Sequence, residues 1–97
     1  MSVIVHTKAN CHYCVKAKDF LKESGVEFEE VFYDPSDESY ESRKNTLVAK
    51  TDWRTFPQIF VGEHFVGGFS ELVTDFTTLR FHELCATIGI EVEYPDF

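Results

Sequence analysis

The chain has 97 residues, of which 43% are hydrophobic and 15% aromatic. This composition is enough for one packed domain, leaves no room for a second core and argues against disorder. The formal charge of −8 argues against a nucleic acid partner. No apolar stretch approaches the ~20 residues of a membrane span and no signal-peptide pattern is present. We therefore expect a cytoplasmic protein without membrane contact.

The first third of the chain predicts a β-α-β unit. Val3–Thr7 is short and β-branched, which is typical of a buried strand. Apolar residues at helical spacing predict a helix over Cys11–Ser24. Glu27–Tyr33 alternates apolar and acidic residues and predicts a second strand. Two strands joined by a helix of this length form a right-handed unit with parallel strands.

The middle of the chain predicts a helix followed by a hairpin. Asp34-Pro35 has the features of a helix start, and this polar helix is expected to run to about Lys50. Pro57–Val61 and His64–Val66 predict two strands joined by a tight turn at Gly62-Glu63.

The last third predicts a helix that starts at a cap on Ser70 and reaches Gly89, either continuous or bent at Thr77-Thr78. Residues 90–97 form a short acidic tail, and the sequence does not decide whether Tyr94 and Phe97 pack on the body. The expected fold class is α/β: a four-stranded mixed sheet flanked by helices. The chain forms a single domain over residues 1–97, with a core at about residues 2–89.

Two cysteines three residues apart follow the first strand and open the first helix. Cys11 is expected to cap or begin that helix, where free backbone N–H groups and the helix dipole favour thiolate over thiol. Such positions lower a cysteine pKa from about 8.5 to roughly 3.5–7.5. Cys14 lies within one helical turn of Cys11, close enough for an internal disulfide. This arrangement indicates thiol–disulfide exchange.

Other uses of the cysteines fit less well. Three cysteines is an odd number, which does not suit a secreted disulfide framework. Zinc would require a second Cys/His pair, but Cys85 stands alone and the histidines are scattered, so we expect no metal site. Cys85 lies on an apolar stripe and is expected to be a buried structural residue; a regulatory thiol is the alternative.

Charge is unevenly distributed along this acidic chain. Residues 1–18 contain Lys8, Lys16 and Lys18 and no acidic residue. This local basic patch either arises by chance in a short segment or stabilises a thiolate and bound anions.

Three motifs in this order resemble glutaredoxin over roughly residues 2–89. They are Cys11-His12-Tyr13-Cys14 after the first strand, Thr55-Phe56-Pro57 before the third strand, and Gly67-Gly68 after the fourth. The resemblance implies a thioredoxin fold, glutathione as cosubstrate and a cis peptide bond before Pro57.

The resemblance also implies roles for individual residues. Cys11 is expected to be the nucleophile and Cys14 the resolving cysteine. Lys8 matches a cation near the thiolate and a glutathione carboxylate, or is an ordinary solvated lysine. Tyr13 matches the aromatic residue that flanks the bound tripeptide, or packs on its helix.

The other implied contacts come from two loops. Phe56 would pair with glutathione through its backbone, beside Pro57, and Arg54 would meet the glycyl carboxylate. A four-residue segment matches the region that receives the γ-glutamyl end: Gly68, Phe69, Ser70 and Glu71.

The sequence departs from the family pattern at three places. His12 replaces the usual proline between the cysteines, Phe56 replaces valine, and Ser70-Glu71 replaces two aspartates. His12 frees a backbone N–H and adds a titratable ring that stabilises the thiolate when protonated, or it faces solvent with little effect. Some non-proline members bind a [2Fe–2S] cluster between two subunits, which makes cluster binding an alternative.

The sequence therefore predicts a glutathione-dependent thiol–disulfide oxidoreductase that reduces protein disulfides and glutathione mixed disulfides. Its expected partners are glutathione and oxidised proteins, with ribonucleotide reductase as a target by family analogy, and the chain is expected to be a monomer. The alternatives are an electron donor that depends on thioredoxin reductase and a glutathione-ligated [2Fe–2S] carrier.

Overall fold

The side chains of the first strand alternate between the two faces of the sheet. We describe residues 1–95 from a computed structural model. In β1 (Val3–Lys8), Val3, Val5 and Thr7 are buried, while the residues between them are half-buried. Because side chains alternate along a strand, odd-numbered and even-numbered residues of β1 face opposite sides of the sheet.

The four strands form one mixed sheet in the order β2-β1-β3-β4. β2 (Glu29–Tyr33) runs parallel to β1, and β3 (Gln58–Val61) runs antiparallel to it. β4 (His64–Gly67) pairs antiparallel with β3 across the predicted two-residue turn. The predicted topology is confirmed, although β2 begins two residues later than predicted.

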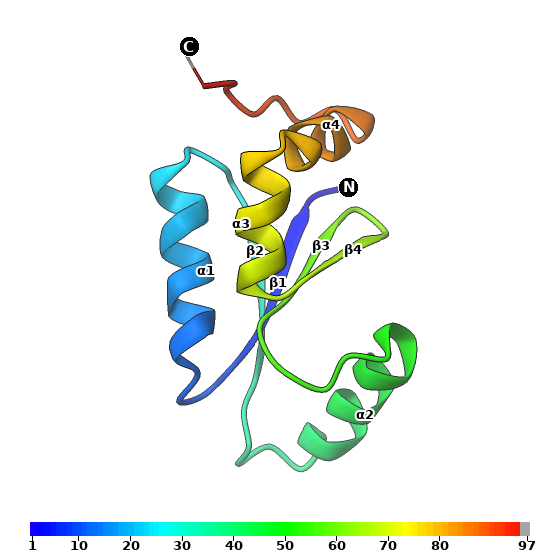
Figure 1. Cartoon of the computed structure of the whole chain (residues 1–97). Helices are drawn as coiled ribbons and strands as arrows, with labels where there is room; N and C mark the ends of the chain where they lie inside the picture. Colours follow the sequence, from blue (N-terminus) through cyan, green and yellow to red (C-terminus); the bar gives the residue numbers. More distant parts are fainter. Residues whose placement is uncertain (96–97) are drawn as a thin grey trace.

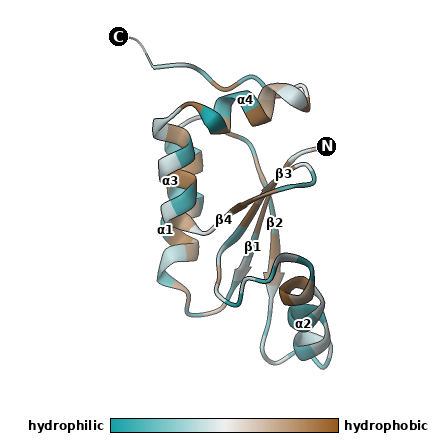
Figure 2. Cartoon of the chain, turned by 45° about the vertical axis from the view of Figure 1, so that its right-hand side comes forward, coloured by the Kyte–Doolittle hydropathy of each residue, from teal (hydrophilic) through white to brown (hydrophobic). Residues whose placement is uncertain are grey.

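Four helices flank the sheet: α1 (His12–Glu23), α2 (Tyr40–Thr51), α3 (Phe69–Thr77) and α4 (Arg80–Thr87). α1 and α3 lie side by side on one face of the sheet, and α2 stands apart on the other (Figure 1). Figure 2 shows the hydrophobic stretches of the strands between these two helical layers. None of the helices within residues 1–95 has the length and apolar character needed to cross a bilayer.

The core has two parts, one on each face of the sheet. The larger part lies under α1, α3 and α4 and consists of Val3, Val5, Ala17, Leu21, Val26, Ile59, Val61, Leu72, Phe81, Cys85 and Val92. The smaller part is mostly aromatic and consists of Cys14, Tyr33, Leu47, Phe56 and Phe60. We call this second group the aromatic cluster; because it includes Cys14, it extends directly to the dithiol.

The predicted start of the second helix at Asp34-Pro35 is wrong, since α2 begins at Tyr40. The Asp34 carboxylate accepts hydrogen bonds from the N–H (3.0 Å) and hydroxyl (2.8 Å) of Ser36. Asp37 makes the same pair of bonds with the residue two positions further on. These local side-chain bonds satisfy the backbone in a pair of turns and delay the helix.

The last predicted helix is divided into two, at the bend that was predicted as one of two alternatives. α3 ends at Thr77 and α4 begins at Arg80. Between them, Leu79 has a φ of +67°, a left-handed conformation that cannot continue a right-handed helix. The bend turns α4 across the end of the molecule opposite the start of α1 (Figure 1).

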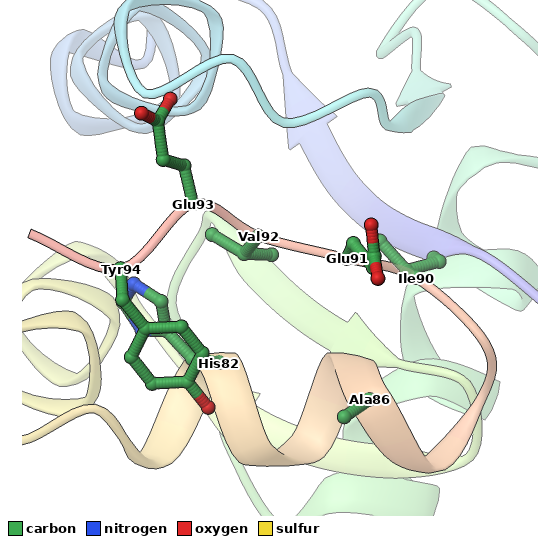
Figure 3. Close-up of a pocket in the computed structure, with 7 residues that line it drawn as sticks. All are labelled: His82, Ala86, Ile90, Glu91, Val92, Glu93 and Tyr94. Carbon is green, nitrogen blue, oxygen red and sulfur yellow. The ribbon is translucent and has the colours of Figure 1, made fainter.

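The tail packs on α4 as far as the described residues extend. Val92 is buried in the larger core, and the Tyr94 ring lies 4.8 Å from the ring of buried His82. A cavity of about 520 Å³ lies between the tail and α4 (Figure 3). The position of Tyr94 is therefore settled, while Phe97 lies outside the described residues.

The loop that leads into β3 is held by the fully buried side chain of Gln58. Its Nε2 donates to the Trp53 carbonyl (2.6 Å), and its Oε1 accepts from the Thr51 hydroxyl (2.9 Å). These bonds join the end of α2 to β3, and therefore fix both ends of the loop that contains Phe56 and Pro57.

We predict that Gln58→Leu lowers the free energy of unfolding by about 1–3 kcal/mol, the cost of leaving the Trp53 carbonyl without its partner. The Thr51 hydroxyl keeps its hydrogen bond to the Leu47 carbonyl. Urea unfolding monitored by circular dichroism measures the change. Thr77→Val is the control, since it removes only an exposed hydroxyl bond. A Gln58→Leu protein as stable as the wild type would show that these bonds do not hold the loop.

The predicted burial of Cys85 on α4 is confirmed, and burial raises the pKa of its thiol to about 11. At pH 8 about one thiol in a thousand is then ionised, three pH units below that pKa. We predict that, in the reduced protein at pH 8, iodoacetamide labels Cys85 only after unfolding. Peptide mass spectrometry identifies the labelled cysteines, and Cys85→Ala should take up one label fewer than the wild type in the unfolded state only. A label on Cys85 in the folded wild type would favour the regulatory alternative.

Candidate active site

Cys11 is the N-cap of α1, in an extended conformation (φ −111°, ψ 102°). Its Sγ accepts a hydrogen bond from the backbone N–H of Cys14 at 3.2 Å. The two cysteines form a disulfide, with 5.2 Å between their Cα atoms. Cys14 is only 2% exposed, whereas Cys11 is half-buried, so an incoming sulfur reaches Cys11 first.

The surroundings of the Cys11 sulfur favour negative charge. The first turn of α1 contains no acidic residue, and its N–H groups and helix dipole point towards the sulfur. The exposed His12 ring, 5.9 Å from that of Tyr13, occupies the first helical position. Replacing proline with His12 adds one more N–H to this group.

Phe56 and Pro57 lie against the dithiol. The peptide bond between them is cis, as predicted. The Phe56 carbonyl oxygen lies 3.5 Å from Cys11 Sγ, close enough to accept a hydrogen bond from the thiol once the disulfide is reduced. Both residues are buried, and the group that this loop places beside the sulfur is the Phe56 carbonyl.

The segment from Gly68 to Glu71 begins α3, but Ser70 is not its cap. Gly68 is the N-cap, and Ser70 lies exposed in the first turn. Glu71 Oε1 accepts a hydrogen bond from the Gly68 N–H at 2.9 Å. One oxygen of the Glu71 carboxylate, which was expected to contact glutathione, therefore caps the helix. A Cβ on Gly68 would lie 3.6 Å from the Pro57 carbonyl oxygen, which places this segment beside the Phe56–Pro57 loop.

Tyr13 extends the site from α1 towards α3. Its side chain is 55% exposed, and its ring lies 6.1 Å from that of Phe69. Lys16 Nζ lies 5.4 Å from the Tyr13 ring and 5.9 Å from the Phe69 ring. Tyr13 is therefore an outward-facing residue of the site, and not part of either core.

The three lysines of the basic N-terminal segment have different surroundings. Lys18 forms a salt bridge with Glu30 at 3.0 Å. A hydrogen bond from Thr7, followed by Lys18, lowers the pKa of Glu30 below its ordinary value. Lys8 Nζ instead lies 5.8 Å from the Phe56 ring, and makes no salt bridge within residues 1–95. Lys8 lines the same cavity as Cys11 and therefore supplies positive charge near the dithiol.

Arg54 is exposed on the loop before Phe56 and makes no salt bridge or side-chain hydrogen bond in the described part of the chain. Like Lys8, it is available to an anionic ligand. All the residues expected for the site therefore belong to three segments: the end of β1 with the start of α1, the loop before β3 and the start of α3.

Sequence reasoning missed two exposed apolar side chains in a mixed polar and apolar cavity beside the dithiol. A cavity of about 560 Å³ is lined by both cysteines and by Val15 and Phe32, which are 52% and 48% exposed. Val15 and Phe32 do not fall on the buried faces of their elements, so the sequence could have indicated that they are exposed. It gives no sign that they lie beside Cys11.

The glutaredoxin family model matches residues 3–66. The chain is 39% identical over 70 residues to glutaredoxin from Pseudomonas aeruginosa, which covers 72% of this chain and 79% of the relative. It is 31% identical over 71 residues to glutaredoxin 3 from Escherichia coli, with 73% and 81% covered.

Solved structures agree with these relatives. The buckwheat glutaredoxin–glutathione complex gives a TM-score of 0.83 at 19% identity, covering 94% of this chain and 82% of the other. Glutaredoxin from Brucella melitensis gives 0.74 at 29% identity, covering 93% and 94%. The expected thioredoxin fold, a four-stranded mixed sheet flanked by helices, is confirmed. With a dithiol at the start of α1 and a family match that runs from β1 into β4, this chain belongs to the glutaredoxin family of thiol–disulfide oxidoreductases.

Proposed function

We propose that the protein is a glutathione-dependent oxidoreductase that reduces glutathione mixed disulfides and protein disulfides. The observation that carries this proposal is the environment of Cys11 Sγ, which accepts the Cys14 N–H at 3.2 Å and lies 3.5 Å from the Phe56 carbonyl. The helix start stabilises the thiolate, and the backbone of Phe56 beside the dithiol offers a place where an extended peptide such as glutathione can pair.

The reaction starts from the reduced protein. The Cys11 thiolate attacks the glutathione sulfur of a mixed disulfide, which forms a Cys11–glutathione disulfide and releases the protein as a thiolate that takes up a proton. A second glutathione, as thiolate, attacks the glutathione sulfur of that intermediate, which yields oxidised glutathione and restores the Cys11 thiolate. Glutathione supplies both electrons, and glutathione reductase reduces the oxidised glutathione with two electrons from NADPH.

For a protein disulfide, Cys11 forms a mixed disulfide with one substrate sulfur and the other leaves. Cys14, one turn further along α1, then attacks Cys11 Sγ and releases the reduced substrate. That step would form the Cys11–Cys14 disulfide, the pairing seen in the structure. Two glutathione molecules would then reduce it, which yields oxidised glutathione and restores both thiols. Ribonucleotide reductase stays a predicted target by family analogy.

The three segments of the site provide complementary contacts for glutathione. Lys8 and Arg54 supply positive charge for its glycyl carboxylate, and Phe56 supplies backbone hydrogen bonds beside Pro57. The γ-glutamyl end would meet the helix start at Gly68, Phe69, Ser70 and Glu71, with Tyr13 flanking the tripeptide. The complex of buckwheat glutaredoxin with glutathione supports a tripeptide site in this family. A cytoplasmic monomer is the expected state.

The iron–sulfur alternative requires a different donor set. Within residues 1–95, no three or more His, Cys, Asp or Glu side chains are grouped so as to hold a metal ion. A cluster shared by two subunits would take Cys11 from each, with glutathione as the other ligand, and His12 in place of proline is the feature that prompts it. Anaerobic purification with glutathione tests this alternative by its visible absorbance and by dimer formation.

We predict that Cys11→Ser reduces glutathione-coupled turnover of a glutathionylated protein to the uncatalysed rate, because no nucleophile remains. Cys14→Ser should retain most of that activity but lose reduction of protein disulfides, which requires the second thiol. Consumption of NADPH in the presence of glutathione and glutathione reductase measures both reactions.

The control is Cys85→Ala, which should leave both rates unchanged because Cys85 is buried far from the dithiol on α4. Equal turnover by Cys11→Ser and wild type would refute the assigned nucleophile. Replacing glutathione and its reductase with thioredoxin reductase should stop turnover. Faster turnover with thioredoxin reductase would instead favour the electron-donor alternative.

A further inference from the structure

A polar pair lies inside the aromatic cluster, on the sheet face below the dithiol. His6 Nδ1 and the Tyr33 hydroxyl are 2.9 Å apart, and Tyr33 is only 5% exposed. The β1–β2 register brings the two together: Lys8 pairs with Tyr33 and His6 with Val31, so all four side chains lie on the face opposite α1. This pair is absent from the mechanism described above.

Both partners are neutral near pH 7. Burial, and then the charges of Lys50 and Arg43, lower the pKa of His6 below its ordinary value. Burial raises the pKa of Tyr33, with Arg43 opposing it. The hydrogen bond therefore joins two uncharged groups, and both remain so across the neutral range in which the dithiol operates.

The pair fixes a ring on which Phe56 rests. The Tyr33 ring lies 5.3 Å from the Phe56 ring at an angle of 56°, and the Arg43 guanidinium lies 4.4 Å from the Tyr33 ring on the α2 side. Lys8 Nζ lies 5.8 Å from the Phe56 ring. Phe56 is 7% exposed, so its ring has little freedom to move without moving its backbone.

That backbone carries the carbonyl that lies 3.5 Å from Cys11 Sγ. The carbonyl oxygen and the Cys14 N–H act on the sulfur in opposite directions. The N–H stabilises the thiolate, whereas the carbonyl accepts from the thiol and repels the thiolate. The position of Phe56 is therefore one of the factors that set the pKa of Cys11.

We propose that Tyr33, held by His6, is a positioning residue that keeps the Phe56 carbonyl beside Cys11 and so limits ionisation of the nucleophile. The side chain of Phe56 thus has a role here, although glutathione recognition needs only its backbone. This proposal rests on the proposed function, because that function assigns Cys11 as the nucleophile. The experiment that tests it uses no glutathione, so the two proposals can fail separately.

The test measures the rate of iodoacetamide alkylation against pH in the Cys14→Ser background, where Cys11 is the reactive thiol. Tyr33→Leu removes both the ring and the hydroxyl, and should lower the midpoint by about half to one pH unit, the shift expected for losing one hydrogen bond to the thiol. His6→Leu should shift it in the same direction. His6→Gln, which keeps an acceptor for the hydroxyl, should restore the original midpoint.

Tyr40→Phe is the matched control, because Tyr40 packs against the same cluster and its hydroxyl makes no hydrogen bond within residues 1–95. Its midpoint should equal that of the parent. Cooperative urea unfolding establishes that each variant is folded. If Tyr33→Leu does not fold, the comparison of His6→Leu with His6→Gln tests the proposal. An unchanged midpoint in folded Tyr33→Leu, or identical midpoints for His6→Leu and His6→Gln, would overturn the proposal.

A structural defect alone would lower stability without lowering the midpoint of Cys11. The outcomes for the two proposals are also separable. Loss of the pH shift with intact glutathione-coupled turnover would reject only the role of Tyr33. Failure of that turnover with the pH shift present would reject only the proposed function.

Discussion

The hydrogen bond from the Cys14 N–H to Cys11 Sγ, at the first turn of α1, is the interaction on which the rest of the site depends. It exists because Cys11 is an N-cap with extended backbone, so that its sulfur can accept from an N–H of the first turn. β1 ends three residues before Cys11, and the buried face of α1 packs on the sheet, which together hold this cap in place. A thiol elsewhere on the helix would lack these N–H groups and would ionise like an ordinary cysteine.

The two faces of the sheet contribute differently to this site. The larger core, under α1, α3 and α4, fixes the helix on which the dithiol lies. The aromatic cluster on the other face is covered by α2 and by cations that lie over its rings: Lys8 over Phe56, Arg43 over Tyr33 and Lys50 over Phe60. The second face therefore combines support for the Phe56–Pro57 loop with positive charge in an otherwise acidic protein.

Periodic patterns gave the strands, the first helix and the hairpin, because apolar spacing reflects which side of an element is buried. Side-chain hydrogen bonds made the predicted helix start wrong at two places. Asp34 and Asp37 hold turns where a helix was predicted, and Glu71 caps Gly68 where Ser70 was the expected cap. The contact between His6 and Tyr33 joins residues 27 apart and depends on strand register, which the sequence alone does not provide. The candidate site residues were found through motifs, while Val15 and Phe32 belong to no motif.

The most direct test of this account is the pKa of Cys11 in the reduced wild-type protein. Alkylation at each pH, with the modified cysteine identified by peptide mass spectrometry, gives that value without glutathione or a partner protein. The account predicts that Cys11 reacts before Cys14, with a midpoint well below the ordinary value of about 8.5. A midpoint at or above that value, or first reaction at Cys14, would contradict the claim that the start of α1 creates the nucleophile.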